Sequence, residues 1–244
     1  MENNRLVVGN LKMNMVADEI SSYLKVINKN IYSEQVVICP SSIYIPYFLK
    51  QRYRVGIQNI AAENKGAYTG EVSATQAYSL GVQYALVGHS ERRALFNEND
   101  LTVNQKVKIA IKNNLYPIIC VGETNEDKVM LRTEKILKKQ ITYALRDLNP
   151  DELNNVIIAY EPVWSIGTNK IPSNKDIKST ISYIKLLVEN LYGYNGIKVL
   201  YGGSVSQKNI KQLVKIDNLD GFLVGGASLN PDEFLNIIEV AVTK

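Results

Sequence analysis

Cysteine and long apolar runs are both scarce in this chain of 244 residues. Its two cysteines, Cys39 and Cys120, each end a strand-like run, and their spacing is not that of metal ligands. We therefore expect two buried thiols rather than a disulfide, and no metal site. No apolar run approaches the length of a membrane span, and residues 1–20 lack the apolar core of a signal peptide. These absences predict a cytoplasmic protein without a membrane partner.

Long blocks of Lys and Arg are absent as well, although the net charge is +4. Proteins that bind nucleic acids through a basic arm carry such blocks, so we expect no nucleic-acid partner. The slight positive balance is compatible with an anionic small-molecule substrate but does not require one. Hydrophobic residues make up 45% of the chain, which is typical of a globular protein.

What the chain does contain is a regular alternation of short apolar runs and amphipathic segments. The apolar runs predict buried parallel strands over residues 6–10, 36–39, 55–58, 84–88, 116–121, 156–160, 197–201 and 221–224. Helices are expected between them, over residues 16–30, from a serine cap at 41–42, and over 73–80, 101–114, 127–145, 174–191, 206–215 and 231–242. Eight units without a break in composition predict a single (β/α)8 barrel that covers residues 1–244.

The alternative fold is an open, doubly wound sheet. Such sheets usually have fewer units and carry a glycine-rich dinucleotide-binding loop after the first strand. Here the first strand leads into residues 9–12, Gly-Asn-Leu-Lys, which do not match that loop. The barrel is therefore the favoured fold.

Glu161 directly follows the apolar run 156–160, so we expect it at the carboxyl end of a strand, where α/β proteins place their chemistry. Pro162 stiffens the chain after it. The next residues are typical of a hinged lid that leads to Gly167, whose bare backbone could approach a ligand closely. For the acid taken alone, an exposed side chain on an ordinary loop is about equally plausible.

Asn10 and Lys12 lie at the end of the first predicted strand, where side-chain alternation could point both to one side. A lysine in this place could neutralise a phosphate group or a developing oxyanion. For these two residues alone, a surface lysine beside a turn asparagine is the plainer interpretation, by roughly two to one.

His89 is the only histidine in the chain, and it follows the fourth predicted strand. A histidine at a strand end that faces a helix N-terminus sits where the positive end of the helix dipole disfavours protonation of the ring. A lone histidine is nevertheless more often a structural hydrogen-bonding residue, by about three to one.

Two glycine pairs follow the last two strands: Gly202-Gly203 precedes Ser204, and Gly225-Gly226 opens a helix. Backbone N–H groups at a helix start form a site for anions, and barrels often bind phosphate with the loops after strands seven and eight. Tight turns would explain either pair alone, whereas both pairs at these two loops favour phosphate binding.

Four features resemble the signature segments of the triosephosphate isomerase family, in that family's order and spacing. They are GNLKMN at 9–14, VGHSERR at 87–93, YEPVWSIGT at 160–168 and the two glycine pairs. The resemblance covers the whole chain and implies the TIM-barrel fold.

The sequence departs from the family pattern at a few positions. Leu11 replaces the usual Trp, for which we expect a packing change without loss of chemistry. In the lid, Ser165 replaces Ala, Asn169 replaces Gly, and Ile171-Pro172 replaces a commoner Thr-Ala. The substitutions in the lid affect the expected rate at which the lid opens, but not the identification of this segment as the lid.

The resemblance implies catalytic roles for four residues. Glu161 would be the base that moves the proton, and His89 would donate a hydrogen bond as a neutral imidazole. Lys12 would stabilise the developing oxyanion, with Asn10 assisting. For each of them the plainer structural interpretation loses its advantage once the surrounding motif is taken into account.

Binding and supporting roles follow from the same resemblance. Backbone N–H groups would hold the substrate phosphate, together with the side chains at the end of strand one; the residues are Asn10, Lys12, Gly167, Ser204, Gly225 and Gly226. Among the supporting residues, Glu91 would orient Lys12, and Arg92 would pair with Glu98.

The resemblance also predicts a lid and a subunit contact. The lid would consist of Pro162, Val163, Trp164, Ser165, Ile166, Gly167, Thr168, Asn169 and Lys170. Residues 58–59 and 66–73 resemble the family's dimer loop. The tip of this loop, formed by Thr69, Gly70 and Glu71, would reach Asn10 and Lys12 of a partner subunit. A homodimer is therefore expected. A long solvated loop is the alternative, although loops of this length inside compact domains usually have a role.

The implied activity is the interconversion of dihydroxyacetone phosphate and D-glyceraldehyde 3-phosphate through an enediolate, a step of glycolysis and gluconeogenesis. This intramolecular aldose–ketose isomerisation has no redox step, so no nicotinamide, metal or other cofactor is expected. Two rivals stay open. A phosphate-binding barrel lyase or synthase would share the glycine pairs but not all four catalytic residues, and a barrel without turnover would only bind.

Overall fold

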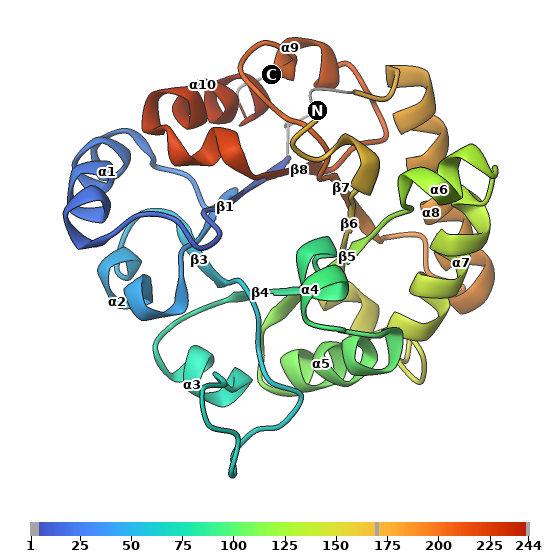
Figure 1. The fold of residues 1–244 in the computed structure, drawn as a ribbon, viewed down its shortest axis with the longest axis horizontal. Coiled ribbons are helices and arrows are strands. Elements are labelled where there is room, and N and C mark those ends of the chain that lie inside the picture. Colours follow the sequence, from blue (N-terminus) through green and yellow to red (C-terminus); the bar gives the residue numbers. More distant parts are fainter. Residues whose placement is uncertain (1–4, 169–170, 243–244) are drawn as a thin grey trace.

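The computed structural model describes residues 5–168 and 171–242, which form a closed barrel of eight parallel strands (Figure 1). Each strand pairs with its neighbours in the sequence, and β8 returns to pair with β1. The strands are β1 (Leu6–Asn10), β2 (Val36–Cys39), β3 (Arg54–Ile57), β4 (Tyr84–Val87), β5 (Tyr116–Val121), β6 (Ile157–Tyr160), β7 (Lys198–Tyr201) and β8 (Gly221–Val224). The predicted (β/α)8 barrel is confirmed.

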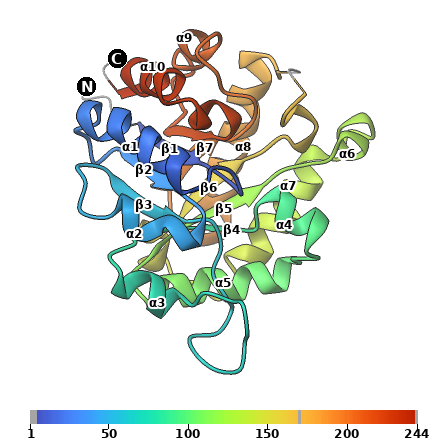
Figure 2. The same ribbon diagram turned by 60° about the vertical axis from the view of Figure 1, so that its left-hand side comes forward.

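Helices surround the barrel as an outer ring (Figures 1 and 2). They are α1 (Ala17–Asn30), α2 (Ile45–Phe48), α3 (Ala74–Ser79), α4 (Ser90–Leu95), α5 (Asp100–Lys112), α6 (Asn125–Val129), α7 (Thr133–Ala144), α8 (Asn174–Tyr192), α9 (Ile210–Leu213) and α10 (Pro231–Val242). Short 3-10 turns accompany them: η1 (Ser42–Tyr44), η2 (Glu152–Asn155), η3 (Val163–Ser165) and η4 (Gly226–Leu229). Within the two described ranges, no helix is long and apolar enough to cross a membrane.

The strands are buried on both faces, which explains why their sequences are apolar runs rather than alternating ones. One row of alternate residues fills the barrel interior, and the other packs against the helices. Cys39 and Cys120 belong to the interior cluster as free, buried thiols, as predicted. On β1, Val8 lies in this interior row, so Asn10 continues the row at the carboxyl end of the strand.

Two helices are shorter than the sequence predicts. The segment 127–145 is divided into α6 and α7, because Leu131 takes a left-handed backbone conformation between them, with φ of 55°. The segment 206–215 contains only the four residues of α9. There the Asn209 side chain accepts from the Ser206 N–H (2.9 Å) and donates to Ser204 O (2.8 Å), and these local bonds compete with helix formation.

Two helix starts also differ from expectation. Ser41 makes no side-chain cap, and the chain passes through η1 before α2, where Pro46 occupies the first turn. A helix N-terminus was expected beside His89, and the short helix α4 begins directly after it, but its range was not among the predicted helices. By contrast, Ser73 caps α3 as expected for a serine at a helix start, and Gln76 completes the capping box.

The loop between β3 and α3, residues 58–73, projects from the body of the barrel (Figures 1 and 2). A hydrogen bond from Ala61 N to Val72 O (2.8 Å) closes its base. At its tip, Glu71 N donates to Tyr68 O (3.1 Å), while the side chains of residues 65–71 are exposed. A backbone hydrogen bond therefore fixes the conformation of the tip, while its side chains are exposed to solvent.

Candidate active site

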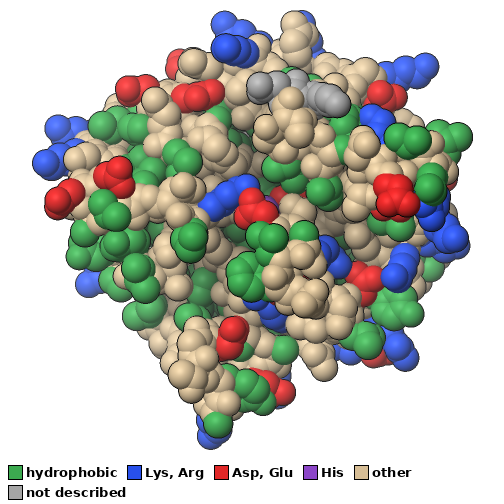
Figure 3. Space-filling view, in the orientation of Figure 1, with side chains coloured by type: hydrophobic (Ala, Val, Ile, Leu, Met, Phe, Trp, Pro, Cys, Tyr) green, Lys and Arg blue, Asp and Glu red, His purple; other side chains and the backbone are tan. Residues whose placement is uncertain are grey.

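The carboxyl ends of the strands bring the predicted site residues into one cavity of about 720 Å³. Its lining includes every predicted catalytic and phosphate-binding residue, namely Asn10, Lys12, His89, Glu161, Gly167, Ser204, Gly225 and Gly226. In the space-filling view this face is hollowed near its centre, where a basic and an acidic side chain meet (Figure 3). Residues from five strand ends thus converge, although they lie far apart in the sequence.

Glu161 follows β6, and contacts of its backbone with the end of β5 fix its position. Its N–H donates to Val121 O on β5 (2.7 Å), and its side chain is only 3% exposed. Its carbonyl passes so close to Gly122 that a Cβ there would lie 1.7 Å from the Glu161 oxygen. Only glycine fits at that contact, so the chain after β5 and the chain after β6 position the carboxylate together.

His89 and Glu161 face each other inside the cavity. The Nε2 atom of His89 lies 3.2 Å from Oε1 of Glu161, and the Ser90 N–H donates to the other carboxylate oxygen (3.2 Å). On the far side of the ring, Nδ1 accepts from the Glu91 N–H (3.2 Å). Because Nδ1 is an acceptor, the proton of the neutral ring lies on Nε2 and points toward the cavity.

The two buried groups shift each other's protonation. Burial alone would lower the pKa of His89, but Glu161 and Glu91 together raise it above its ordinary value. Burial alone would raise the pKa of Glu161, whereas the His89 ring, the Ser90 N–H and Lys12 hold it below its ordinary value. Glu161 is therefore ionised in the substrate-free site.

In this state of the site, two carboxylates oppose the effect that the helix dipole was expected to have on His89. The helix that follows, α4, has only six residues, while carboxylate oxygens of Glu161 and Glu91 lie 3.2 and 3.8 Å from the ring nitrogens. Two close carboxylates outweigh a short helix dipole. A substrate that separates Glu161 from the ring would remove the larger of these two attractions.

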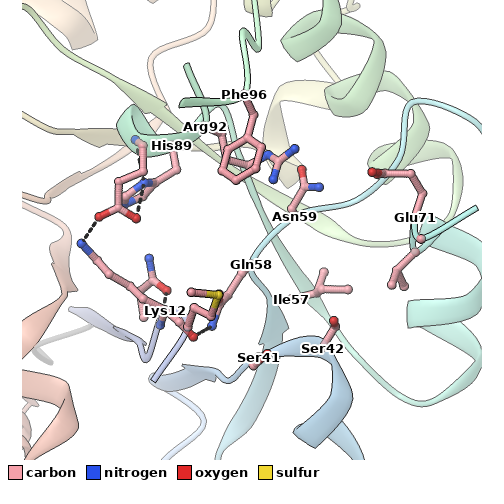
Figure 4. Close-up of a pocket in the computed structure, with 15 residues that line it drawn as sticks. Lys12, Ser41, Ser42, Ile57, Gln58, Asn59, Glu71, His89, Arg92 and Phe96 are labelled. Atoms are coloured by element: carbon pink, nitrogen blue, oxygen red, sulfur yellow. Dashed lines mark hydrogen bonds and ion pairs between the residues drawn. The ribbon is translucent and has the colours of Figure 1, made fainter. Parts of the chain in front are cut away.

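Lys12 reaches into the cavity from the loop after β1. Its Nζ lies 2.5 Å from Oε1 of Glu91, and its N–H donates to the Asn10 side chain (3.0 Å) (Figure 4). Its backbone is left-handed, with φ of 53°, and its carbonyl accepts from the Gln58 side chain (2.8 Å). Sequence reasoning placed Gln58 at the end of the third strand and in the dimer loop, but gave it no role in positioning Lys12.

The glycine loop at residues 225–226 lies next to Lys12. A Cβ built on Gly225 would be 3.5 Å from Cε of Lys12, so the lysine side chain passes directly over that loop. Around Gly226, by contrast, the space where a side chain would be is open. An anion on these backbone groups would therefore also lie next to the Lys12 ammonium group.

The first half of the lid is docked on the end of β5. The Trp164 indole N–H donates to Oε1 of Glu123 (2.7 Å), and the Tyr160 hydroxyl lies 3.2 Å from both oxygens of that carboxylate. The Lys128 ammonium group sits 3.1 Å from the centre of the Trp164 ring. Sequence reasoning did not identify Glu123 or Lys128. The predicted lid residues Asn169 and Lys170 lie outside the described residues.

A buried ion cluster lies behind the site. Glu98 accepts from Arg92 (2.8 Å), from Lys106 (2.5 Å) and from the Gly88 N–H (2.9 Å), and so ties α4 and α5 to the end of β4. Sequence reasoning paired Arg92 with Glu98 but missed Lys106. The signal was present, because Lys106 occupies the same stripe of α5 as the buried Val103, where an apolar residue belongs.

We predict that His89→Gln raises the pKa of Glu161. The substitution removes the charge attraction and the hydrogen bond of the ring, while the burial that favours the neutral acid stays. The carboxylate of the variant should then take up a proton at a higher pH than in the wild type. A ¹³C NMR titration of the Glu161 carboxyl carbon measures this, with Asp127 on α6 as an unchanged reference. An equal or lower midpoint for Glu161 would contradict the coupling.

Comparison with known proteins agrees with this geometry. The sequence profile of the triosephosphate isomerase family matches residues 5–241. The triosephosphate isomerase of Alkaliphilus oremlandii is 41% identical over 242 residues, which are 96% of this chain and 98% of that protein. That of Clostridium botulinum is 40% identical with the same coverage, and that of Francisella philomiragia is 41% identical over 97% of both chains. With a profile match and relatives that both cover nearly its whole length, the chain belongs to the triosephosphate isomerase family.

Proposed function

We propose that the protein interconverts dihydroxyacetone phosphate and D-glyceraldehyde 3-phosphate, the activity carried in the names of its relatives. The observation that supports this most is the direct juxtaposition of Glu161 and His89, 3.2 Å apart, in a cavity that Lys12 and the glycine loops also line. A carboxylate base beside a hydrogen-bond donor is what proton transfer next to a carbonyl group requires. This combination argues against a lyase or synthase that shares only the phosphate loops.

The reaction needs one proton to move between two neighbouring carbons and another to move between the oxygens that these carbons carry. Glu161 removes the proton from the carbon next to the carbonyl, and the electron pair of the C–H bond forms the enediolate. The Nε2–H of His89 and the Lys12 ammonium group stabilise its oxygens, with Asn10 assisting. Glu161, now a neutral acid, returns the proton to the adjacent carbon. The hydroxyl proton passes to the former carbonyl oxygen, so the carbonyl reforms one position along the chain.

Phosphate binding would hold the substrate in register for this transfer. The backbone at Gly225 and Gly226, and that at Gly167 and Ser204, borders the same cavity as Glu161. Lys12 lies beside Gly225, so its charge would act on the phosphate as well as on the oxyanion. We propose that residues 162–170 close over the bound phosphate, exclude water and so hold back loss of phosphate from the enediolate. The docked position of Trp164 on Glu123 would have to be released in that movement.

The direct test is isomerase turnover of D-glyceraldehyde 3-phosphate, followed through a dehydrogenase that consumes the dihydroxyacetone phosphate formed. Turnover by the purified chain supports the proposal. A folded protein that binds triose phosphate without turning it over would instead favour a barrel that only binds. The expected cytoplasmic location stays a prediction.

We also propose that the protein is a homodimer. A second cavity of about 330 Å³ adjoins the site, between the projecting loop and the residues after β1 and β4 (Figure 4). Large apolar side chains are exposed on the loops after strands one, two and four, among them Met13 (93%), Ile43 (72%) and Phe96 (63%). Their exposure supports coverage by a second copy. Thr69 at the loop tip would then approach Lys12 of the partner subunit.

Thr69→Arg is expected to shift the protein to monomers, because a long charged side chain at the loop tip would be buried in the interface. Sedimentation velocity at micromolar concentration should give a dimer for the wild type and mainly monomer for the variant. Leu131→Arg is the matched control, since Leu131 is 93% exposed but lies between α6 and α7. A monomeric wild type, or a Thr69→Arg variant as dimeric as the control, would contradict the proposal.

A further inference from the structure

Gly122, the first residue after β5, is held by a side chain that the proposed mechanism does not use. Gln140 on α7 accepts from the Gly122 N–H through Oε1 (2.8 Å) and donates to the Gly122 carbonyl through Nε2 (3.2 Å). One side chain therefore binds both polar backbone groups of one residue. A side-chain amide is suited to this task, because it carries an acceptor and a donor side by side.

The backbone at Gly122 lies directly against the proposed base. A Cβ at residue 122 would lie 1.7 Å from the carbonyl oxygen of Glu161 and 2.6 Å from its carbonyl carbon. At the end of β7, a Cβ on Gly202 would lie 2.9 Å from Cγ of Glu161. Glu161 thus packs against the bare backbone of two glycines, and a displacement of either backbone would shift its carboxylate.

A glycine at residue 122 makes this close approach possible, but it does not fix the chain there. It has no side chain to pack, and glycine permits more backbone conformations than any other residue. β5 ends at Val121, so Gly122 lies outside the strand. The two hydrogen bonds from Gln140 therefore supply the restraint that neither a strand nor a side chain gives to this residue.

Helix α7 holds Gln140 in a fixed place. Its neighbours Leu137 and Ile141 on the helix are buried in the core, and Gln140 itself is half-buried. The side chain thus projects from a well-packed helix, and its two bonds tie the position of Gly122 to the outer ring of the barrel. Gln140 does not line the cavity, so it can act on the reaction only through other residues.

We infer that Gln140 is a positioning residue, which fixes the backbone of Gly122 and thereby holds Glu161 in place for proton transfer. The inference rests on the proposed function and adds to it a residue outside the cavity. Gly122 provides the room that the Glu161 carbonyl needs, and Gln140 removes the conformational freedom that comes with a glycine.

Gln140→Met removes both hydrogen bonds and keeps an unbranched side chain of similar length. We expect kcat to fall about 10- to 100-fold, because a small displacement of a catalytic group lowers the rate steeply. KM should change by less than about twofold, since the phosphate-binding backbone at Gly225 and Gly226 is untouched. Gln140→Glu keeps the acceptor but loses the donor, so it should lower kcat as well.

Steady-state kinetics with D-glyceraldehyde 3-phosphate compare the wild type with both Gln140 variants. Ile141→Val is the matched control, because it opens a small cavity on the same helix and leaves the bonds of Gln140 in place. It should lower Tm without changing kcat. A second test adds Gln140→Met to Glu161→Gln, which has no base left to position. There we expect no further fall in the residual kcat, whereas a general loss of structure would lower it again.

Three results would overturn the inference. In the first, Gln140→Met and Gln140→Glu both keep the kcat of the wild type. In the second, Gln140→Met lowers the residual kcat of Glu161→Gln by the same factor as that of the wild type. In the third, Ile141→Val reproduces the fall in kcat at an equal loss of Tm. A folded wild type without turnover would instead refute the proposed function itself, and the inference with it.

Discussion

Glu161→Gln is expected to lower kcat by about 10²- to 10⁴-fold or more, because it removes the base that takes the substrate proton. The amide has the size of the carboxylate and keeps an oxygen that can accept the Ser90 N–H bond seen in the structure. It cannot accept a proton at neutral pH, so the effect on kcat is chemical rather than structural. The coupled isomerase assay measures it.

Glu161→Asp is the companion variant. It keeps the negative charge but withdraws the carboxylate by about one methylene from the substrate and from His89, so a large fall in kcat is expected here too. Thermal unfolding monitored by circular dichroism should show both variants folded, since neither adds volume next to Gly122. Wild-type kcat in Glu161→Gln would refute the assignment of the base.

Lys12→Met is expected to lower kcat/KM by at least about 10²- to 10³-fold, with a rise in KM as well as a fall in kcat. Methionine keeps an unbranched side chain of similar shape but has no charge. Lys12 lies both over the Gly225 loop and 2.5 Å from Glu91, so its loss weakens phosphate binding and oxyanion stabilisation together. It also leaves the Glu91 carboxylate unpaired at the mouth of the site.

Steady-state kinetics with D-glyceraldehyde 3-phosphate separate the two effects of Lys12→Met. Lys139→Met is the control, because Lys139 is an exposed lysine on α7 whose side chain is 63% accessible. Lys139→Met lowers the net charge of the protein by the same amount as Lys12→Met, but it leaves the charge inside the cavity unchanged. If the two variants have equal KM and kcat, Lys12 acts only through the net charge and the proposed roles are wrong.

Much of the fold could be predicted because its strands have both faces buried. Runs such as Val36–Cys39 and Gly221–Val224 are short and apolar, follow a polar residue and end at a proline or glycine, and the observed strands agree with them. The strand ends then indicated where site residues lie, since parallel strands of a barrel end on the same face. This rule alone predicted that Asn10 and Glu161 lie at strand ends on that face, before any contact between them was known.

Local backbone choices were harder to predict. A helical pattern runs through 127–145, and only the left-handed backbone of Leu131 divides it. Asn209 removes the first turn from the helix expected at 206 by bonding to its own neighbours. A few hydrogen bonds decide such competition between side chain and backbone, and the hydrophobic periodicity of the sequence does not report them.

The sequence by itself determined the eightfold alternation, the barrel, and the residue types that a proton-transfer site with a phosphate pocket needs. Only the tertiary structure decided their protonation and mutual orientation. The raised pKa of His89 depends on Glu161 across 3.2 Å, and the lid's docking depends on the hydrogen bond from Trp164 to Glu123. These groups come from different strand ends, and charge and hydrogen-bond interactions depend on distances that periodicity along the chain does not encode.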